Sequence, residues 1–390
     1  MPQSRRFPSG RVSIVGAYES PRRKAPGIHP FQIHAEVIAG ALSDAGLSVA
    51  DVDGFATTAT FPPEAGWQLS IAEVAEYVGL QPRWFDSTDL GGAAFVAHAG
   101  HAVAAIEAGL CEVAVVSYGA CGRSGPLPYP DYNTNATGPG QWEVPFGPST
   151  VSTYALAAQR HMHEYGTTSE QLAAIAVQCR ENASKNEHAR YRGPLTVEDV
   201  VSSSMISSPL HKFDCCVVTD SGGAFVLAAT ERARDLPKRP VRVLGFGEAV
   251  GQVQMNQMPD FTSTATKRSG ADAYAAAGMG PQDIQAAQLY DSFTITVAMA
   301  LEDLGFVPKG EVGGYVQDGN IAPTGRLPIN TDGGGLSSNH PGRRGALATI
   351  EGVRLLRGES PGAQIDSLEN CLVSATGGSL SATATMILGV

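Results

Sequence analysis

The chain has 390 residues, of which 43% are hydrophobic and 17% are charged, and its formal net charge is −11. This size and apolar content indicate a globular protein with core material for two domains or for one large duplicated α/β unit. The acidic balance argues against nucleic-acid binding, which normally needs a basic face. No apolar run approaches the roughly 18 residues of a membrane span, and the N-terminus lacks the apolar core of a secretory signal.

The six cysteines form no CxxC pair and show no spacing typical of a metal site. The simplest interpretation is a reduced, cytoplasmic chain without a metal centre.

The first part of the chain alternates strand and helix patterns. Short strands are predicted at 12–18 (VSIVGAY) and 55–60, and helices that end at glycines are predicted at 31–45 and 69–79. Residues 91–109 are almost wholly small and apolar, which predicts a central helix buried on all sides. The run CEVAVVS at 111–117 predicts a buried strand of the parallel type.

Residues 119–149 are irregular and rich in Pro, Gly, Asn and Tyr. A loop this long inside a compact chain is usually functional, so we expect a lid or a partner-binding segment. Its aromatic residues would line an apolar substrate tunnel or pack the lid: Tyr129, Tyr132 and Trp142. Amphipathic helices at 151–165 and 169–186 and a strand at 225–228 complete the first half.

The second half repeats the pattern of the first. PVRVLGFGEAV (240–250) corresponds to RVSIVGAYES (11–20), and CLVSATGG (371–378) corresponds to CEVAVVSYG (111–119). Two duplicated halves rich in βαβ units predict a layered α/β architecture, in which two central helices lie back to back between two mixed sheets.

The stretch at 330–358 combines a glycine cluster (Gly333, Gly334, Gly335) with a histidine and a periodic apolar segment. We expect a tight glycine loop that delivers His340 just ahead of a helix, with Pro341 in its first turn. The buried face of that helix is predicted to carry Leu347, Ile350, Val353 and Leu356. A histidine so placed suits acid–base work or the polarisation of a carbonyl oxygen. From this stretch alone, a capping or surface histidine is the preferred interpretation.

Five segments agree in order and spacing with the thiolase superfamily: 165–183, 213–228, 288–295, 330–346 and 374–388. The chain resembles the sterol-carrier-protein-2 thiolases and the related lipid-transfer-protein-like aldolases of steroid side-chain breakdown. This resemblance implies a thiolase fold, with duplicated βαβαβαββ halves in αβαβα layers. The N-terminal half would span 1–235 with a loop insertion at about 119–215, and the C-terminal half 236–390.

The chain departs from the thiolase pattern at the reacting groups. A thiolase uses a cysteine thiolate at the start of the first central helix. Here residues 85–109 hold no cysteine, and Gly92 stands near the nucleophile's place. The family's second cysteine falls within 375–378, which reads ATGG, and the histidine of its HDCF motif is replaced by Tyr290. The histidine of the HP motif is kept as His340. The Cys215–Cys216 pair resembles one of this branch and is expected in the core.

These departures exclude acyl exchange through the usual cysteine and leave three hypotheses. The first is retro-aldol cleavage of a β-hydroxyacyl-CoA, with Tyr290 accepting or relaying the hydroxyl proton if its pKa is lowered and His340 donating to the enolate oxygen. The second is direct acyl transfer or retro-Claisen cleavage in which His340 activates CoA or water, with the helix start near Gly91 and Gly92 as the oxyanion site. The third is a non-catalytic scaffold or lipid-carrier subunit.

The resemblance to the thiolase superfamily also implies which residues support the two candidate reacting groups. The resemblance places Asp291, Asn339 and Ser338 beside the two reacting groups, Ser338 standing where the steroid aldolases carry a second tyrosine. Gly377 and Gly378 would join the two helix-start glycines in a CoA and oxyanion site. Asp89 is expected to cap the helix. Arg343 and Arg344 would meet CoA phosphates, although solvated helix charges are commoner.

The resemblance also implies the partners of the chain. Thiolases dimerise through the first-half sheet, so a homodimer is expected. The lipid-transfer-like aldolases pair with a separate zinc-ribbon and OB-fold subunit of the DUF35 class. A CoA thioester is expected as substrate, with no permanently bound cofactor. Steroid, aromatic and branched acyl groups all stay open.

Overall fold

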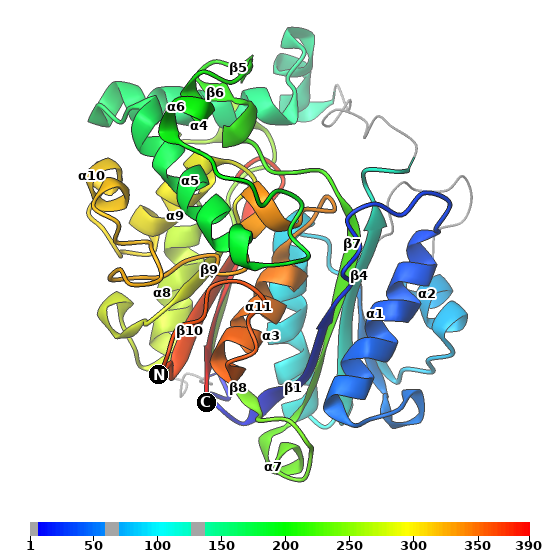
Figure 1. Cartoon of the computed structure of the whole chain (residues 1–390). Coiled ribbons are helices and arrows are strands. Elements are labelled where there is room, and N and C mark those ends of the chain that lie inside the picture. The colour runs from blue at the N-terminus through cyan, green and yellow to red at the C-terminus, as the bar shows by residue number, and fades with distance from the viewer. Residues whose placement is uncertain (1–6, 59–69, 126–136) are drawn as a thin grey trace, which may run out of the picture.

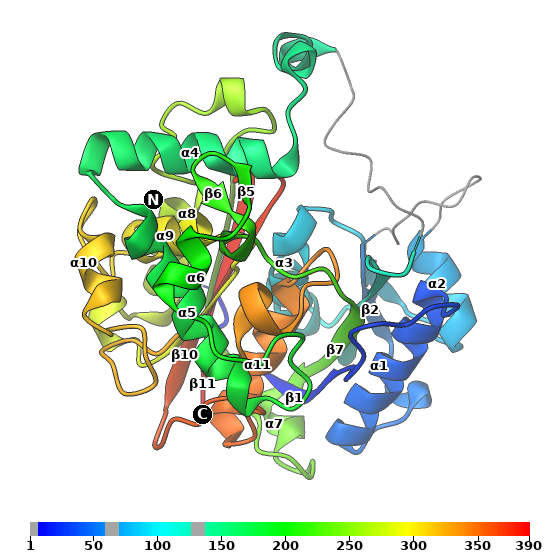
Figure 2. The same cartoon turned by 45° about the horizontal axis from the view of Figure 1, so that its top comes forward.

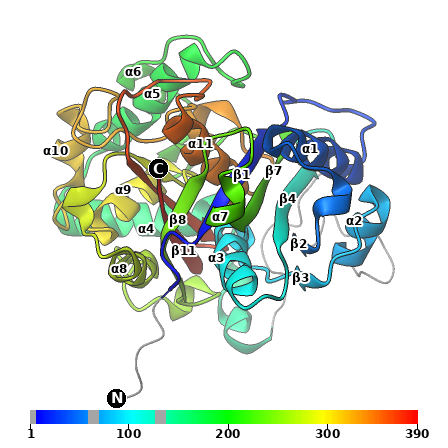
Figure 3. The same ribbon diagram turned by 90° about the horizontal axis from the view of Figure 1, so that it is seen from below.

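A computed structural model describes residues 7–58, 70–125 and 137–390 of the chain (Figure 1). In these residues, nine strands form one mixed sheet in the order β3-β2-β4-β7-β1-β8-β11-β10-β9. Its two halves meet where β1 (Val12–Glu19) lies beside β8 (Val241–Val250), which Figure 3 shows from below. Two residue pairs, Ser13–Arg242 and Ile14–Val241, make this junction. The two predicted sheets are therefore joined at one edge by a short stretch of hydrogen bonding.

The first half of the sheet is formed by β1, β2 (Gly54–Ala56), β3 (Trp84–Asp86), β4 (Val113–Cys121) and β7 (Asp220–Ala229). Strand β2 runs parallel to β3 and β4, and β4 runs antiparallel to β7. Helices α1 (Pro30–Ala45) and α2 (Ser70–Val78) belong to this half, and α1 covers β1, β4 and β7.

The second half mirrors this arrangement. Its strands are β8, β9 (Ala287–Leu289), β10 (Asn370–Gly377) and β11 (Ala382–Gly389). Its outer face is covered by α8 (Thr266–Ala277), which packs on β8 and β11 and is joined by α9 (Thr294–Asp303). Strand β8 occupies the place of β1, and β10 the place of β4, as the internal repeat predicted.

Two helices lie between the halves of the sheet (Figure 2). Helix α3 (Ala94–Glu107) contacts β4, β7 and β11, and α11 (Gly345–Arg357) contacts β10, β7 and β1. A side chain at Gly345 would overlap the backbone carbonyl of Gly92, so glycine allows the starts of the two helices to touch. The layers are α1 and α2, sheet, α3 and α11, sheet, then α8 and α9. The predicted αβαβα layering is confirmed.

The expectation that Pro341 lies in the first turn of a helix is wrong. Helix α11 begins at Gly345, and a turn through Gly342 (φ +102°) separates it from His340. That φ value is incompatible with a right-handed helix, so the helix cannot extend back to the proline. The predicted apolar face is buried as expected, at Leu347, Ile350, Val353 and Leu356.

The described residues 137–219, between β4 and β7, lie over one end of the strands (Figures 1 and 2). They contain α4 (Thr150–Tyr165), α5 (Ser169–Lys185), α6 (Val197–Val201), β5 (Met205–Ser207) and β6 (Leu210–His211). The short helices α7 (Thr230–Ala233) and α10 (Val312–Gln317) follow later in the chain. Trp142 is 70% exposed, and Tyr129 and Tyr132 lie outside the described residues.

Among the helices that the structure describes, none is both long and apolar enough to cross a membrane. The described side chains also contain no cluster of three His, Cys, Asp or Glu arranged to hold a metal ion.

Candidate active site

Tyr290 and His340 meet in the interior, although 50 residues separate them in sequence. Tyr290 Oη and His340 Nε2 lie 2.9 Å apart, and the two rings are perpendicular, at 89°. Tyr290 directly follows β9, and its N–H donates to the carbonyl of Ser374 on β10. The backbone N–H of His340 donates to Thr219 Oγ1 at 3.0 Å. Backbone anchors on both sides therefore set the geometry of this hydrogen-bonded pair.

Burial keeps both members of the pair uncharged. Desolvation raises the pKa of Tyr290 well above its ordinary value. Desolvation, with the nearby Arg344 cation as a smaller cause, lowers the pKa of His340 to about 4. The retro-aldol hypothesis required a lowered pKa if Tyr290 is to take the hydroxyl proton. The structure does not meet this condition, because desolvation raises the pKa of Tyr290 by more than the nearby Arg343 lowers it. Tyr290 offers a neutral hydroxyl that can relay a proton.

Four glycines pack together beside this tyrosine. A side chain on Gly92 would overlap the ring of Tyr290, and one on Gly91 would come within 2.9 Å of the Gly378 nitrogen. A side chain on Gly377 would overlap the carbonyl of Leu90. The structure therefore brings together the four glycines that the resemblance assigned to the oxyanion site. Their role in binding stays a prediction.

The glycine cluster before His340 wraps around the carboxylate of Asp291. Residues Gly334–Ser338 form a single π-helical turn (η8), in which Gly335 N donates to Asp291 Oδ1 at 2.7 Å and Leu336 N to Oδ2 at 3.1 Å. Gly334 has φ +65°, and a side chain there would overlap the carboxylate. Burial raises the pKa of Asp291 to about 6. The carboxylate holds this turn in place, and no hydrogen bond recorded between described residues joins it to Tyr290.

Ser338 and Asn339 anchor the backbone that leads to His340. Ser338 Oγ accepts from Asn186 Nδ2 at 3.2 Å. Asn339 Nδ2 donates to Glu19 Oε1 at 2.6 Å and to Ser221 Oγ at 3.0 Å. Both side chains are buried and bond to neighbouring elements, and Asn339 Oδ1 accepts from Thr219 Oγ1 at 2.7 Å, the same hydroxyl that accepts from His340 N.

The two arginines after the histidine differ from expectation. Arg343 pairs with both carboxylate oxygens of Asp89, at 2.8 and 3.0 Å, and Asp89 also accepts from Gly91 N, although the N-cap of this helical turn is Leu90. Arg344 is buried and donates to both carboxylate oxygens of Asp332, at 2.7 and 2.8 Å. The two expectations for Arg344, that it contacts a CoA phosphate or is solvated, are therefore both wrong.

Cys215 and Cys216 do not lie in the core. They are half-buried in the wall of a pocket of about 380 Å³, whose lining includes Arg123, Arg190, Tyr191, Lys212 and Leu336. Cys216 N donates to the carbonyl of Ser292, which ties this wall to the segment that carries Tyr290. Burial raises the pKa of the Cys215 thiol to about 12, so it is not a thiolate at neutral pH.

Comparisons with known proteins extend over the whole chain. A steroid side-chain-cleaving aldolase of Thermomonospora curvata is 36% identical, over 97% of this chain and 98% of the relative. A 17-hydroxy-3-oxo-4-pregnene-20-carboxyl-CoA lyase of Mycobacterium tuberculosis is 35% identical, over 98% of this chain and the full length of the relative. The chain belongs to the aldolase branch of the thiolase superfamily.

Other findings agree with membership of the thiolase superfamily. Residues 247–390 match the family model described as thiolase C-terminal domain-like. A solved structure named Ltp2-ChsH2(DUF35) aldolase is 35% identical and superposes with a TM-score of 0.89, over 98% of this chain and 99% of that one. The human mitochondrial 3-ketoacyl-CoA thiolase, at 15% identity, shares the fold with a TM-score of 0.71, over 97% and 98% of the two chains.

Proposed function

We propose that the chain cleaves the Cα–Cβ bond of a β-hydroxyacyl-CoA by a retro-aldol reaction without a covalent enzyme intermediate. The observation that carries this proposal is the neutral Tyr290–His340 pair, in which Oη and Nε2 lie 2.9 Å apart. The tyrosine ring packs against Gly92, which stands near the place of the thiolase nucleophile. The named activities of the two full-length relatives support it, since both are carbon–carbon cleaving enzymes.

The pair can move the proton that cleavage requires. Tyr290 Oη takes the proton of the substrate β-hydroxyl while its own proton passes to His340 Nε2. The electron pair left on the hydroxyl oxygen forms the C=O bond of the released aldehyde or ketone, and the electrons of the Cα–Cβ bond pass into the thioester enolate. The backbone N–H of Gly92 stabilises the enolate oxygen. The proton returns from His340 through Tyr290 to Cα and completes the shorter acyl-CoA.

A pocket whose wall is tied through Cys216 to the segment that carries Tyr290 suits a CoA ester. Arg123, Arg190 and Lys212 supply positive charge for phosphates, and Phe213 and Leu336 supply apolar lining. We therefore expect Arg190→Glu or Lys212→Glu to raise the KM for the CoA ester with little change in kcat. A cofactor-free enzyme and a cytoplasmic location stay predictions.

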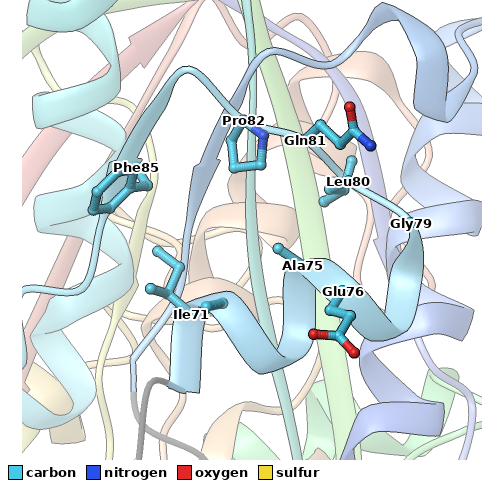
Figure 4. A pocket seen from close by; sticks show the side chains of 9 residues that line it. Ile71, Ala75, Glu76, Gly79, Leu80, Gln81, Pro82 and Phe85 are labelled. Atoms are coloured by element: carbon cyan, nitrogen blue, oxygen red, sulfur yellow. The ribbon is translucent and has the colours of Figure 1, made fainter.

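A second copy of the chain is proposed to pair with strand β3. This strand ends the sheet, whereas β9 at the other end is covered by a bridge from Ile329 to Ala287. Phe85 on β3 is 63% exposed and borders a hollow of about 470 Å³ beside α2 (Figure 4). Among the described residues no strand pairs with the outer edge of β3, and an unpaired edge with an exposed aromatic side chain favours binding of a partner. Sedimentation of Phe85→Glu should show monomers, whereas Phe146→Glu, at a residue that is even more exposed (87%) and lies elsewhere, should stay dimeric.

A separate subunit of the DUF35 class is the second proposed partner, by analogy with the named assembly of the structural relative. An apolar hollow of about 630 Å³ lies beside α4, with Trp142, Phe146 and Leu156 exposed at its rim. From α4, the hydroxyl of Tyr154 donates to the carbonyl of Gly378 at 2.9 Å. A subunit seated there would therefore contact a helix that supports the glycine site.

The test uses purified chain, alone and co-expressed with a DUF35-class protein, and a panel of steroid, aromatic and branched CoA esters. Release of an aldehyde or ketone with a shorter acyl-CoA from a β-hydroxyacyl-CoA supports the proposal. If the chain instead cleaves a β-ketoacyl-CoA, and only when free CoA is added, the retro-Claisen alternative replaces the retro-aldol proposal. If neither β-hydroxyacyl- nor β-ketoacyl-CoA esters are cleaved, with or without the DUF35-class protein, the proposal is overturned and a non-catalytic scaffold is favoured.

A further inference from the structure

The segments that carry Tyr290 and His340 come from different parts of the second half, yet they share one buried cation. Arg344 NH1 donates to the carbonyl of Asn339, the residue before His340, at 2.8 Å. Its Nε lies 3.4 Å from Oδ1 of Asp291, the residue after Tyr290. Its third nitrogen donates to both oxygens of Asp332. One guanidinium thus touches a chain neighbour of each member of the pair.

We infer that Arg344 is a positioning residue for the Tyr290–His340 pair. Its planar fork bonds the Asn339 carbonyl and the Asp332 carboxylate in set directions and holds Nε 3.4 Å from Asp291, an arrangement that a flexible ammonium group cannot reproduce. Asp291 in turn holds the π-helical turn through two backbone N–H groups. A shift of the guanidinium would therefore move the backbone on both sides of the pair, although Arg344 touches neither reacting ring through a recorded contact.

The charges around Arg344 explain why a cation is stable at this buried position. Asp291 and Asp332 face it within the interior, and Glu19 and Arg23 lie further out, paired with each other at 2.9 Å. Two buried carboxylates need a buried cation. The same cation adds to the desolvation that lowers the pKa of His340, and so helps to keep the imidazole a proton acceptor.

The chain offers a matched control in Arg357, at the far end of α11. Its guanidinium is also buried, and it bonds to Asp44 Oδ2 at 2.8 Å and to the carbonyls of Val15 and Arg239 at 2.9 Å. Arg357→Lys therefore removes the same kind of fork from the same helix, at a distance from the reacting pair.

The kinetic test of this inference rests on the proposed function. A second measurement, made without substrate, tests the role of Arg344 independently of that function. Arg344→Lys is expected to lower kcat for β-hydroxyacyl-CoA cleavage about 10- to 100-fold with KM nearly unchanged, the range expected for a misplaced catalytic group. Without substrate, the ¹⁵N resonance of His340 Nε2 should move toward that of an imidazole nitrogen without a hydrogen bond. Arg357→Lys should lower the Tm to a similar extent and change neither kcat nor this resonance.

A folded Arg344→Lys protein with the kcat and His340 resonance of the parent overturns the inference. If Arg344→Lys does not fold, Asp291→Asn takes its place, since the amide keeps the volume and one acceptor but loses the charge that faces Arg344. The same shift and the same loss of kcat are expected, and their absence overturns the inference. If the parent chain cleaves no ester, the proposed function fails, and the resonance alone decides the role of Arg344.

Discussion

Removal of the hydroxyl group of Tyr290 is the most direct perturbation of the proposed reaction. In Tyr290→Phe the ring still packs against Gly92, so the fold should persist. The proton path from the substrate hydroxyl to His340 Nε2 is cut, because Oη is the atom that lies 2.9 Å from this nitrogen. Loss of a general acid–base group costs about 100- to 10,000-fold in rate. At about 1.4 kcal/mol per decade, this equals about 3 to 5 kcal/mol of transition-state stabilisation.

The same substitution leaves His340 Nε2 buried without its tyrosine partner. An orphaned buried polar group costs about 1 to 3 kcal/mol of unfolding free energy. Tyr274→Phe is the matched control, because Tyr274 is also buried and its hydroxyl donates to the carbonyl of Leu304 at 3.1 Å, on α8 away from the pair. Both variants should lose stability in denaturant titrations.

The assay follows release of the shorter acyl-CoA by chromatography at saturating ester, for the parent and both variants. We expect Tyr290→Phe to lose kcat within the stated range and Tyr274→Phe to keep it. A folded Tyr290→Phe protein that cleaves within about threefold of the parent would refute the proton relay, since a general acid–base group contributes far more than that.

Three further outcomes are expected. His340→Gln should lose cleavage as Tyr290→Phe does, and the double variant should be no slower than either single one, because the two groups act as a unit in steady-state kinetics. Denaturant titrations should show a pH effect: the folded pKa of His340, about 4, is below the unfolded 6.5, so the unfolded chain binds the extra proton and stability falls as the pH drops between these values. By pH 4 the parent should lose about 3 kcal/mol more than His340→Gln, and equal losses would count against a buried neutral imidazole. Gly92→Ala should abolish cleavage and lower the Tm because its side chain would strike the ring of Tyr290, whereas Gly314→Ala, with open space around it, should change neither.

The sequence was sufficient for the architecture and for singling out the two residues that the proposal assigns to the reaction. The internal repeat and the alternation of strand and helix patterns are local features, and burial of their apolar faces leaves few ways to arrange the layers. Tyr290 and His340 were found from their places in the thiolase motifs. The absence of a cysteine at the helix start was equally visible in the sequence and set aside the usual covalent chemistry.

Only the tertiary structure decided how these groups behave. The protonation states of Tyr290 and His340 depend on desolvation by residues distant in sequence, which no local pattern contains. Arg344 looked like a surface charge beside Arg343, and its burial follows from carboxylates that only folding brings to it. The helix start moved from Pro341 to Gly345 because the chain turns at Gly342 with a φ of +102°, which a right-handed helix cannot contain. Sequence patterns record which groups are present, whereas charge, distance and hydrogen bonding are set by what the fold packs around them.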